Sequence, residues 1–142
     1  MLKVGDEHRG EGKYLIRSAS DIAPWEGIAT AEPFFEGESV RVLLLGDAAF
    51  GVKIHNERHW IKNSAGARFE AWEPTSALIE HARRAQSLFG LEIDGIDYVL
   101  TREGMHFIEL NPFPRVGLSI ESAAIARKIF RSAMELIDVA TR

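Results

Sequence analysis

Hydrophobic residues follow two different periods along this chain, and their order limits the folds it can adopt. Residues 40–46 (VRVLLLG) and 51–55 (GVKIH) read as strongly apolar strands, and the short connection 47–50 predicts that they form a hairpin. The period then becomes helical after Thr75 or Ser76, either of which can cap a helix that Gly90 would end. The apolar face of this helix recurs at i, i+4, i+7 and i+11: Leu78, Ala82, Ala85 and Phe89.

A second hairpin and a last helix follow. Residues 96–100 (IDYVL) and 105–110 (MHFIEL) are predicted strands, and 101–104 (TREG) is their turn. Ser119 can cap the last helix. Its predicted apolar face comprises Ile120, Ala126, Ile129, Ala133 and Ile137. The order strands, helix, hairpin, helix predicts an α+β fold with a mostly antiparallel sheet and flanking helices.

The remaining segments have weaker patterns. They are predicted as follows: a strand stub at 1–4, a glycine-rich loop at 5–13, a strand at 14–18, an irregular stretch at 18–31, a short extended piece and turn at 31–39, and a long loop with a strand fragment at 56–74.

Composition excludes several classes of function. The chain has 142 residues, which suits one domain, and it has no cysteine, which excludes disulfides, thiolate catalysis and cysteine-based zinc sites. With 17 basic and 21 acidic residues, the net charge of -4 argues against nucleic-acid or membrane partners. The start, MLKVGDEHRG, lacks the apolar region of a signal peptide, and no apolar run reaches ~18 residues. We therefore expect a soluble, cytoplasmic protein.

Three oxygen donors lie on the second predicted hairpin. Glu109 and Asn111 are two residues apart, so their side chains point to the same face of a strand, and Asp97 lies on the partner strand. If Asp97 pairs with Glu109, two carboxylates and an amide share one patch, and a cation would relieve their repulsion. Oxygen ligands suit Mg²⁺. The alternative is that Glu109 faces solvent and Asn111 only begins a turn.

Two further groups of residues could bind anions. Glycines 5, 10 and 12 stand among Lys3, Arg9 and Lys13 in a cationic loop whose backbone N–H groups could hold phosphate. This loop does not have P-loop spacing, and a flexible hairpin loop is the alternative. The second group, on or near the middle strands, is Arg41, Lys53, Arg58 and Lys62, which could equally form an ordinary solvated face. His55 and His59 are four apart but lie on a predicted strand and loop, so a histidine metal site is not expected.

Four segments in chain order resemble the ATP-grasp superfamily, specifically its synapsin and RimK-like branch. LKVGDEHRGEGK resembles the phosphate-binding lysine and mobile glycine-rich loop of that family, and ATAEPFFEGESVRVLLLG resembles its hinge strand. VKIHNERHWIKN resembles its basic strand and Trp-x-x-Asn segment. The last segment, GLEIDGIDYVL followed by GMHFIELNPFPRVG, resembles its metal-binding hairpin with the pattern Asp…Glu-x-Asn.

The resemblance implies a role for individual residues in binding ATP. Lys3 would contact the α- and β-phosphates, and the loop from Gly5 to Lys13, with Gly10 and Gly12, would close over them. Glu32 would accept a hydrogen bond from the adenine amino group. The other implied nucleotide contacts are Phe34 and Phe35 beside the base and Glu36 or Glu38 at the ribose.

The resemblance also implies residues for the metal and the chemistry. Asp97, Glu109 and Asn111 would hold two Mg²⁺ ions, for which Mn²⁺ could substitute. Arg41 and Lys53 would face phosphate or an acidic substrate. Near the γ-phosphate and the acceptor, the implied residues are Lys62, Asn63, Arg115 and Gly117. The prolines at 112 and 114 would turn the chain away after the last ligand.

The implied function is an ATP- and Mg²⁺-dependent ligase that joins a carboxylate to an amine through an acyl phosphate, acting on a small-molecule or peptide substrate. Two alternatives stay open: a non-catalytic, synapsin-like nucleotide-binding or interaction module, and an ATP-grasp kinase that phosphorylates a small hydroxyl substrate.

The resemblance begins at the phosphate lysine, which predicts a partial ATP-grasp domain within a longer enzyme. Residues 1–31 would be a glycine-rich-loop remnant of the N-terminal lobe, and residues 32–142 would be the C-terminal lobe. The strand at residues 1–4 would then be an exposed sheet edge, through which the chain could form a homodimer.

Overall fold

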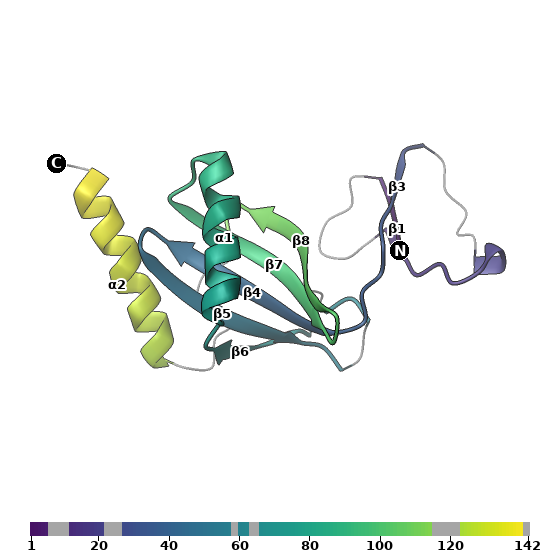
Figure 1. The fold of residues 1–142 in the computed structure, drawn as a ribbon, viewed down its shortest axis with the longest axis horizontal. Helices are drawn as coiled ribbons and strands as arrows, with labels where there is room; N and C mark the ends of the chain where they lie inside the picture. The colour runs from purple at the N-terminus through teal and green to yellow at the C-terminus, as the bar shows by residue number, and fades with distance from the viewer. Residues whose placement is uncertain (6–11, 22–26, 58–59, 63–65, 115–122, 141–142) are drawn as a thin grey trace.

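A computed structural model describes residues 1–5, 12–21, 27–57, 60–62, 66–114 and 123–140 of the chain. The fold is α+β, and every strand pairing among these residues is antiparallel, as the sequence predicts. A five-stranded sheet in the order β6-β5-β4-β7-β8 carries the two helices, and a three-stranded sheet in the order β2-β1-β3 lies at the opposite end of the molecule from α2 (Figure 1).

The large sheet is built from two hairpins and one added strand. Strands β4 (Glu38–Leu45) and β5 (Ala48–His55) form the first hairpin around a turn at 46–47. This turn is shorter than the predicted connection at 47–50. The second hairpin consists of β7 (Ile93–Thr101) and β8 (Gly104–Asn111). The predicted strand fragment is β6 (Arg68–Trp72), which pairs with β5.

Helix α1 (Ser76–Phe89) begins and ends as predicted. The side chain of Thr75 accepts a hydrogen bond from the backbone N–H of Leu78, and Gly90 adopts a left-handed conformation at φ 62°. The helix crosses one face of the large sheet (Figure 1). The core beneath it consists of Leu78 and Ala82 of α1 with Val40, Val42, Leu44, Ile96 and Tyr98 of the sheet.

Helix α2 (Ala123–Ala140) packs on the opposite face, near one end of β4. Because side chains alternate along a strand, Leu43 and Leu45 point away from α1 and are buried against Ile129 and Leu136 of α2. The predicted apolar face of this helix was wrong at Ile137, which is 54 % exposed, whereas Leu136 faces the sheet. The predicted cap Ser119 and Ile120 lie outside the described residues.

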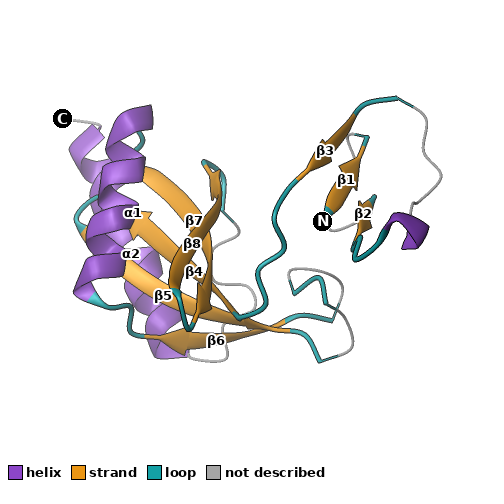
Figure 2. Cartoon of the chain, turned by 45° about the vertical axis from the view of Figure 1, so that its right-hand side comes forward, coloured by secondary structure: helices purple, strands orange, loops and turns teal. Residues whose placement is uncertain are grey.

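The small sheet corrects three predictions. Strand β1 (Leu2–Val4) is central rather than an open edge, because β2 (Lys13–Tyr14) and β3 (Ala29–Ala31) flank it. The strand predicted at 14–18 is instead β2, which begins at Lys13 and ends at Tyr14. Residues 29–31, predicted as irregular, form the strand β3. These strands have only two or three residues each, too few for a recognisable alternation. A short 3₁₀ turn, Ala19–Asp21, lies between β2 and β3 (Figure 2).

Candidate functional site

The strand register places one basic and two acidic side chains in a row across three strands. Arg41 of β4 pairs with Asp97 of β7, and Asp97 pairs with Glu109 of β8. The pairing of Asp97 with Glu109, which was the condition for a shared patch of carboxylates, is thus present. Residues that pair directly across antiparallel strands share a face, so all three lie on the face opposite α1.

A β-bulge puts Glu109 on this face. Tyr98 pairs with Phe107 while Asp97 pairs with Glu109, so Ile108 is an extra residue in β8. In a regular ladder continuing from the pairing of Tyr98 with Phe107, residue 108 would lie opposite Asp97. Glu109 would then point to the α1 side. The bulge therefore creates the pair of carboxylates that the site requires.

Arg41 and Asp97 form a buried, bidentate ion pair. Nε of Arg41 donates to Oδ1 of Asp97 at 2.6 Å, and Nη2 donates to Oδ2 at 2.8 Å, with side-chain exposures of 10 % and 12 %. Burial by itself lowers the pKa of Arg41, but the hydrogen bonds and charge of Asp97, together with the charge of Glu109, raise it overall. Both oxygens of Asp97 are therefore occupied by a permanently charged guanidinium.

Asn111 and Gly95 lie on the same face of the sheet as Asp97 and Glu109, two residues further along each strand. They are directly paired, and Oδ1 of Asn111 accepts a hydrogen bond from the backbone N–H of Phe113 at 2.9 Å. A Cβ atom on Gly95 would lie 2.7 Å from Cβ of Pro114 and 3.2 Å from Cδ of Arg41. Gly95 thus allows the Asn-Pro-Phe-Pro segment to pack closely against the site. Strand β8 ends at Asn111 and the chain bends at residues 112–113, as the two prolines predict.

The donor set fits a hard divalent cation. Asp97 and Glu109 supply carboxylate oxygens, and Asn111 adds an amide oxygen whose second lone pair remains after the bond to Phe113. Among the described residues, no cluster of three His, Cys, Asp or Glu side chains could hold a metal ion by itself. An ion here would therefore depend on the amide, on waters or on a ligand such as phosphate, which is how Mg²⁺ is usually held.

Residues predicted to bind the nucleotide lie in and after the small sheet. Nζ of Lys3 forms an ion pair with Oε1 of Glu32 at 2.8 Å. The side chain predicted to contact phosphate and the one predicted to contact adenine are therefore paired with each other here. Lys3 also pairs with Lys13 across the strands β1 and β2, and Gly12 at φ 64° begins the return of the loop. Gly10 lies outside the described residues.

Aromatic contacts lie along the segment after β3. The ring of Phe35 stacks on His106 of β8 with centroids 3.8 Å apart, and Phe34 meets Trp60 edge-on at 5.7 Å. His106 is not among the residues that the sequence predicts for the site. Its position on β8, one residue before Phe107 and opposite Val99, places it on the face that carries Arg41 and Asp97. Glu36 is exposed.

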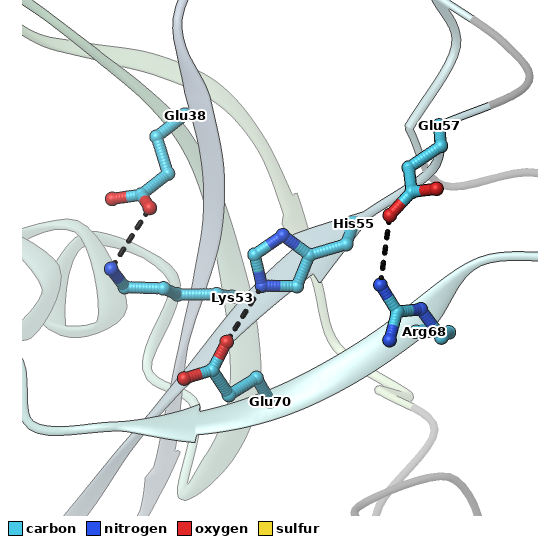
Figure 3. Close-up of polar contacts among 6 residues, drawn as sticks. All are labelled: Glu38, Lys53, His55, Glu57, Arg68 and Glu70. Atoms are coloured by element: carbon cyan, nitrogen blue, oxygen red, sulfur yellow. Dashed lines mark hydrogen bonds and ion pairs between the residues drawn. The ribbon is translucent and has the colours of Figure 1, made fainter.

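Lys53 does not lie beside Arg41. Lys53 pairs with Val40, whose side chain is in the core beneath α1, so Lys53 points to the α1 side of the sheet. There it forms an ion pair with Glu38 at 2.8 Å (Figure 3) and lies 5.7 Å from the centre of the Trp72 ring. Figure 3 shows two further pairs beside it, His55 with Glu70 and Arg68 with Glu57.

Lys62 is held at the end of β5. Its Nζ donates to the backbone oxygen of Asn56 at 3.1 Å, and both residues line a cavity of about 190 Å³. Asn63 and Arg115 lie outside the described residues. The structure therefore brings together Arg41, Asp97, Glu109 and Asn111, but it places Lys53 and Glu38 elsewhere.

Comparison with known proteins bears on the fold. No protein-family model matches the sequence, and no curated protein matches it significantly. A structure of the ATP-grasp ligase PsnB complexed with minimal precursor, Mg and ADP matches with a TM-score of 0.51 and 22 % identity, over 70 % of this chain and 34 % of PsnB. PsnB complexed with precursor peptide PsnA2 and AMPPNP matches with a TM-score of 0.50 and 19 % identity, over 70 % and 33 % of the two chains.

These matches show that the chain folds like part of an ATP-grasp ligase, and it spans about a third of the length of those solved chains. The partial coverage agrees with the predicted C-terminal lobe. In the part of the chain that the structure describes, neither helix is long and apolar enough to cross a membrane.

Proposed function

We propose that this chain carries the metal and phosphate site of an ATP- and Mg²⁺-dependent ligase of the RimK-like branch. The observation that supports this most directly is the row formed by Arg41, Asp97 and Glu109, with Asn111 on the same face. Two carboxylates and an amide facing a buried guanidinium form a site for a cation and an anion together. An ATP phosphate chain with its bound Mg²⁺ has that combination of charges.

Asp97, Glu109 and Asn111 would hold the metal, whose chemistry is to neutralise the charge of the phosphates. Arg41 would balance Asp97 before the nucleotide arrives and contact a phosphate oxygen afterwards, because the planar fork of a guanidinium fits both carboxylate and phosphate. Lys3 would exchange Glu32 for the α- and β-phosphates, and Phe35, fixed by His106, would support the base.

The reaction that we assign to the whole enzyme proceeds in two displacements. A carboxylate oxygen of the substrate attacks the γ-phosphorus and ADP leaves. The amine nitrogen then attacks the acyl carbon, phosphate leaves with the C–O bond electrons, and the nitrogen releases one proton to the phosphate or to solvent. The PsnB structures contain a precursor peptide with nucleotide. We extend that substrate class to this chain, so the carboxylate or the amine would belong to a peptide.

Calorimetric titration of the chain with AMPPNP, with and without Mg²⁺, tests the proposal. Glu109→Gln should abolish the Mg²⁺-dependent part of the binding, because the amide lacks the charge that attracts the ion. Glu103→Gln is the matched control, since Glu103 is an exposed residue in the turn of the same hairpin. The proposal fails if AMPPNP does not bind under either condition, or if both variants bind like the unaltered chain.

A further inference from the structure

Helix α2 is apolar on two sides, and the large sheet covers only one of them. Ile129 and Leu136 pack against Leu43 and Leu45 of β4. On another side of the helix, Phe130 is 68 % exposed, Met134 is 41 % exposed and Ile137 is 54 % exposed. Their spacing of i, i+4 and i+7 makes them one stripe along the helix, which we call the α2 stripe. A helix that only covers a sheet would carry polar residues there.

The charges of α2 are separated along its length. Arg127, Lys128 and Arg131 lie in its N-terminal part, and Glu135 and Asp138 lie in its C-terminal part. The helix has no acidic residue in its first turn and no basic residue in its last turn, so its charges gain nothing from the helix dipole. The separation does, however, give α2 two halves of opposite charge beside one apolar stripe.

Two copies of α2 would have complementary charges in only one relative orientation. In a parallel pair of α2 helices, basic halves would lie against basic halves. In an antiparallel pair, each basic half would lie against the acidic half of the other helix. A two-fold axis near Met134 would place Phe130 of each copy near Ile137 of the other, and Arg131 near Asp138. The same axis would bring the two α2 stripes together.

We infer that the α2 stripe is an interface for a second copy of this chain, formed by antiparallel pairing of the two α2 helices. The inference does not depend on the proposed ligase activity, because the α2 stripe contains none of the residues assigned to the metal or the nucleotide. An interface made by one helix from each copy would be smaller than a standard protein interface, so the dimer should form and dissociate with concentration.

Sedimentation velocity of the full chain over a range of concentrations tests the inference. The unaltered chain should dimerise, and Phe130→Glu should weaken dimerisation by about ten-fold or more, because it puts a charge into the apolar contact with Ile137 of the other copy. Val139→Glu is the matched control. Val139 is 73 % exposed on the same helix, but it lies about 140° around the axis from Met134. Circular dichroism checks that both variants remain folded.

Charge reversal tests the antiparallel orientation separately. Arg131→Glu and Asp138→Arg should each weaken the dimer, and the double variant should restore it, because opposite charges then face each other again. A chain that is monomeric at every concentration would overturn the inference and indicate that another segment or partner covers the stripe. A dimer that survives Phe130→Glu would also overturn it, since the copies would then associate through another surface.

Discussion

At the residue scale, the ion pair between Arg41 and Asp97 links stability to metal binding. Arg41→Met should lower the free energy of unfolding by about 3–5 kcal/mol, because it leaves the carboxylate of Asp97 buried without its partner. Mn²⁺ should restore more stability to this variant than to the unaltered chain, since the metal no longer competes with a guanidinium for Asp97. Urea unfolding with and without MnCl₂ measures both effects.

The control for this prediction is Arg68→Met. Arg68 and Glu57 form an ion pair with side-chain exposures of 64 % and 84 %, so its loss should cost less than about 1 kcal/mol. If Mn²⁺ stabilises Arg41→Met and the unaltered chain equally, Arg41 does not compete with the metal, and its proposed transfer from Asp97 to phosphate is wrong.

Gly95 is the second residue on which the site depends. Gly95→Ala would put a methyl group 2.7 Å from Cβ of Pro114, so this segment and the neighbouring Asn111 must move. We expect a loss of about 1–3 kcal/mol in stability together with weaker Mn²⁺ binding, measured by urea unfolding and by electron paramagnetic resonance. Gly51→Ala is a matched control, because its Cβ would also clash, with Trp72 and Pro74, but far from the metal ligands. It should lower stability without changing Mn²⁺ affinity.

At the scale of elements, the contact between α1 and β7 contains a buried carboxyl group. Asp94 is fully buried, and neither of its oxygens has a hydrogen-bond partner among the described residues. Burial raises its pKa to about 6, although the charge of Arg83 on α1 acts in the opposite direction. Burial, with the charge of Asp94, also raises the pKa of Tyr98 to about 12, and the Tyr98 hydroxyl is hydrogen-bonded to His81.

The raised pKa of Asp94 predicts how stability depends on pH. Between its ordinary value of 3.8 and about 6, the folded chain keeps a proton that the unfolded chain releases, so stability falls as pH rises through this window. Asp94→Asn should remove this loss. The variant should be roughly 1–3 kcal/mol more stable at pH 8, and the difference should disappear below pH 4. Unfolding curves from pH 3 to 8 test this, with the exposed Asp47→Asn as control. A difference that does not change with pH would contradict it.

The register of β8 shows how far local patterns predict the site. A short turn fixes the pairing close to it, so the hairpin and the closeness of Asp97 to the end of β8 could be predicted from the sequence, but the turn alone would put Ile108 opposite Asp97. The bulge at Ile108 could not be predicted, because nothing in the alternation of residues 105–110 distinguishes an extra residue from a regular one. The pairing of Arg41 with Asp97 could not be predicted either. It depends on β4 lying beside β7, which no local spacing specifies.

At the scale of the whole molecule, the sequence predicts the large sheet and its helices far better than the first 31 residues. The helices and strands of residues 38–111 bury continuous apolar faces. A buried face requires apolar residues at regular intervals, and this period can be recognised in the sequence. The strands β1, β2 and β3 contain no fully buried residue. Their pairing depends on backbone hydrogen bonds and on the ion pair between Lys3 and Glu32, neither of which leaves a periodic signal.

This division predicts that the two sheets contribute to different properties. Among the described residues, every buried hydrophobic one lies at position 40 or later, so a chain of residues 32–142 should still unfold in one cooperative transition and should lose less than about 1 kcal/mol of stability. It should bind Mn²⁺ as the full chain does, because Asp97, Glu109 and Asn111 remain, but AMPPNP more weakly, because Lys3 and the glycine-rich loop are gone. Urea unfolding and calorimetry of both chains separate these effects. A large loss of stability would show that the small sheet supports the core, and an unchanged affinity for AMPPNP would exclude Lys3 and its loop from the nucleotide site.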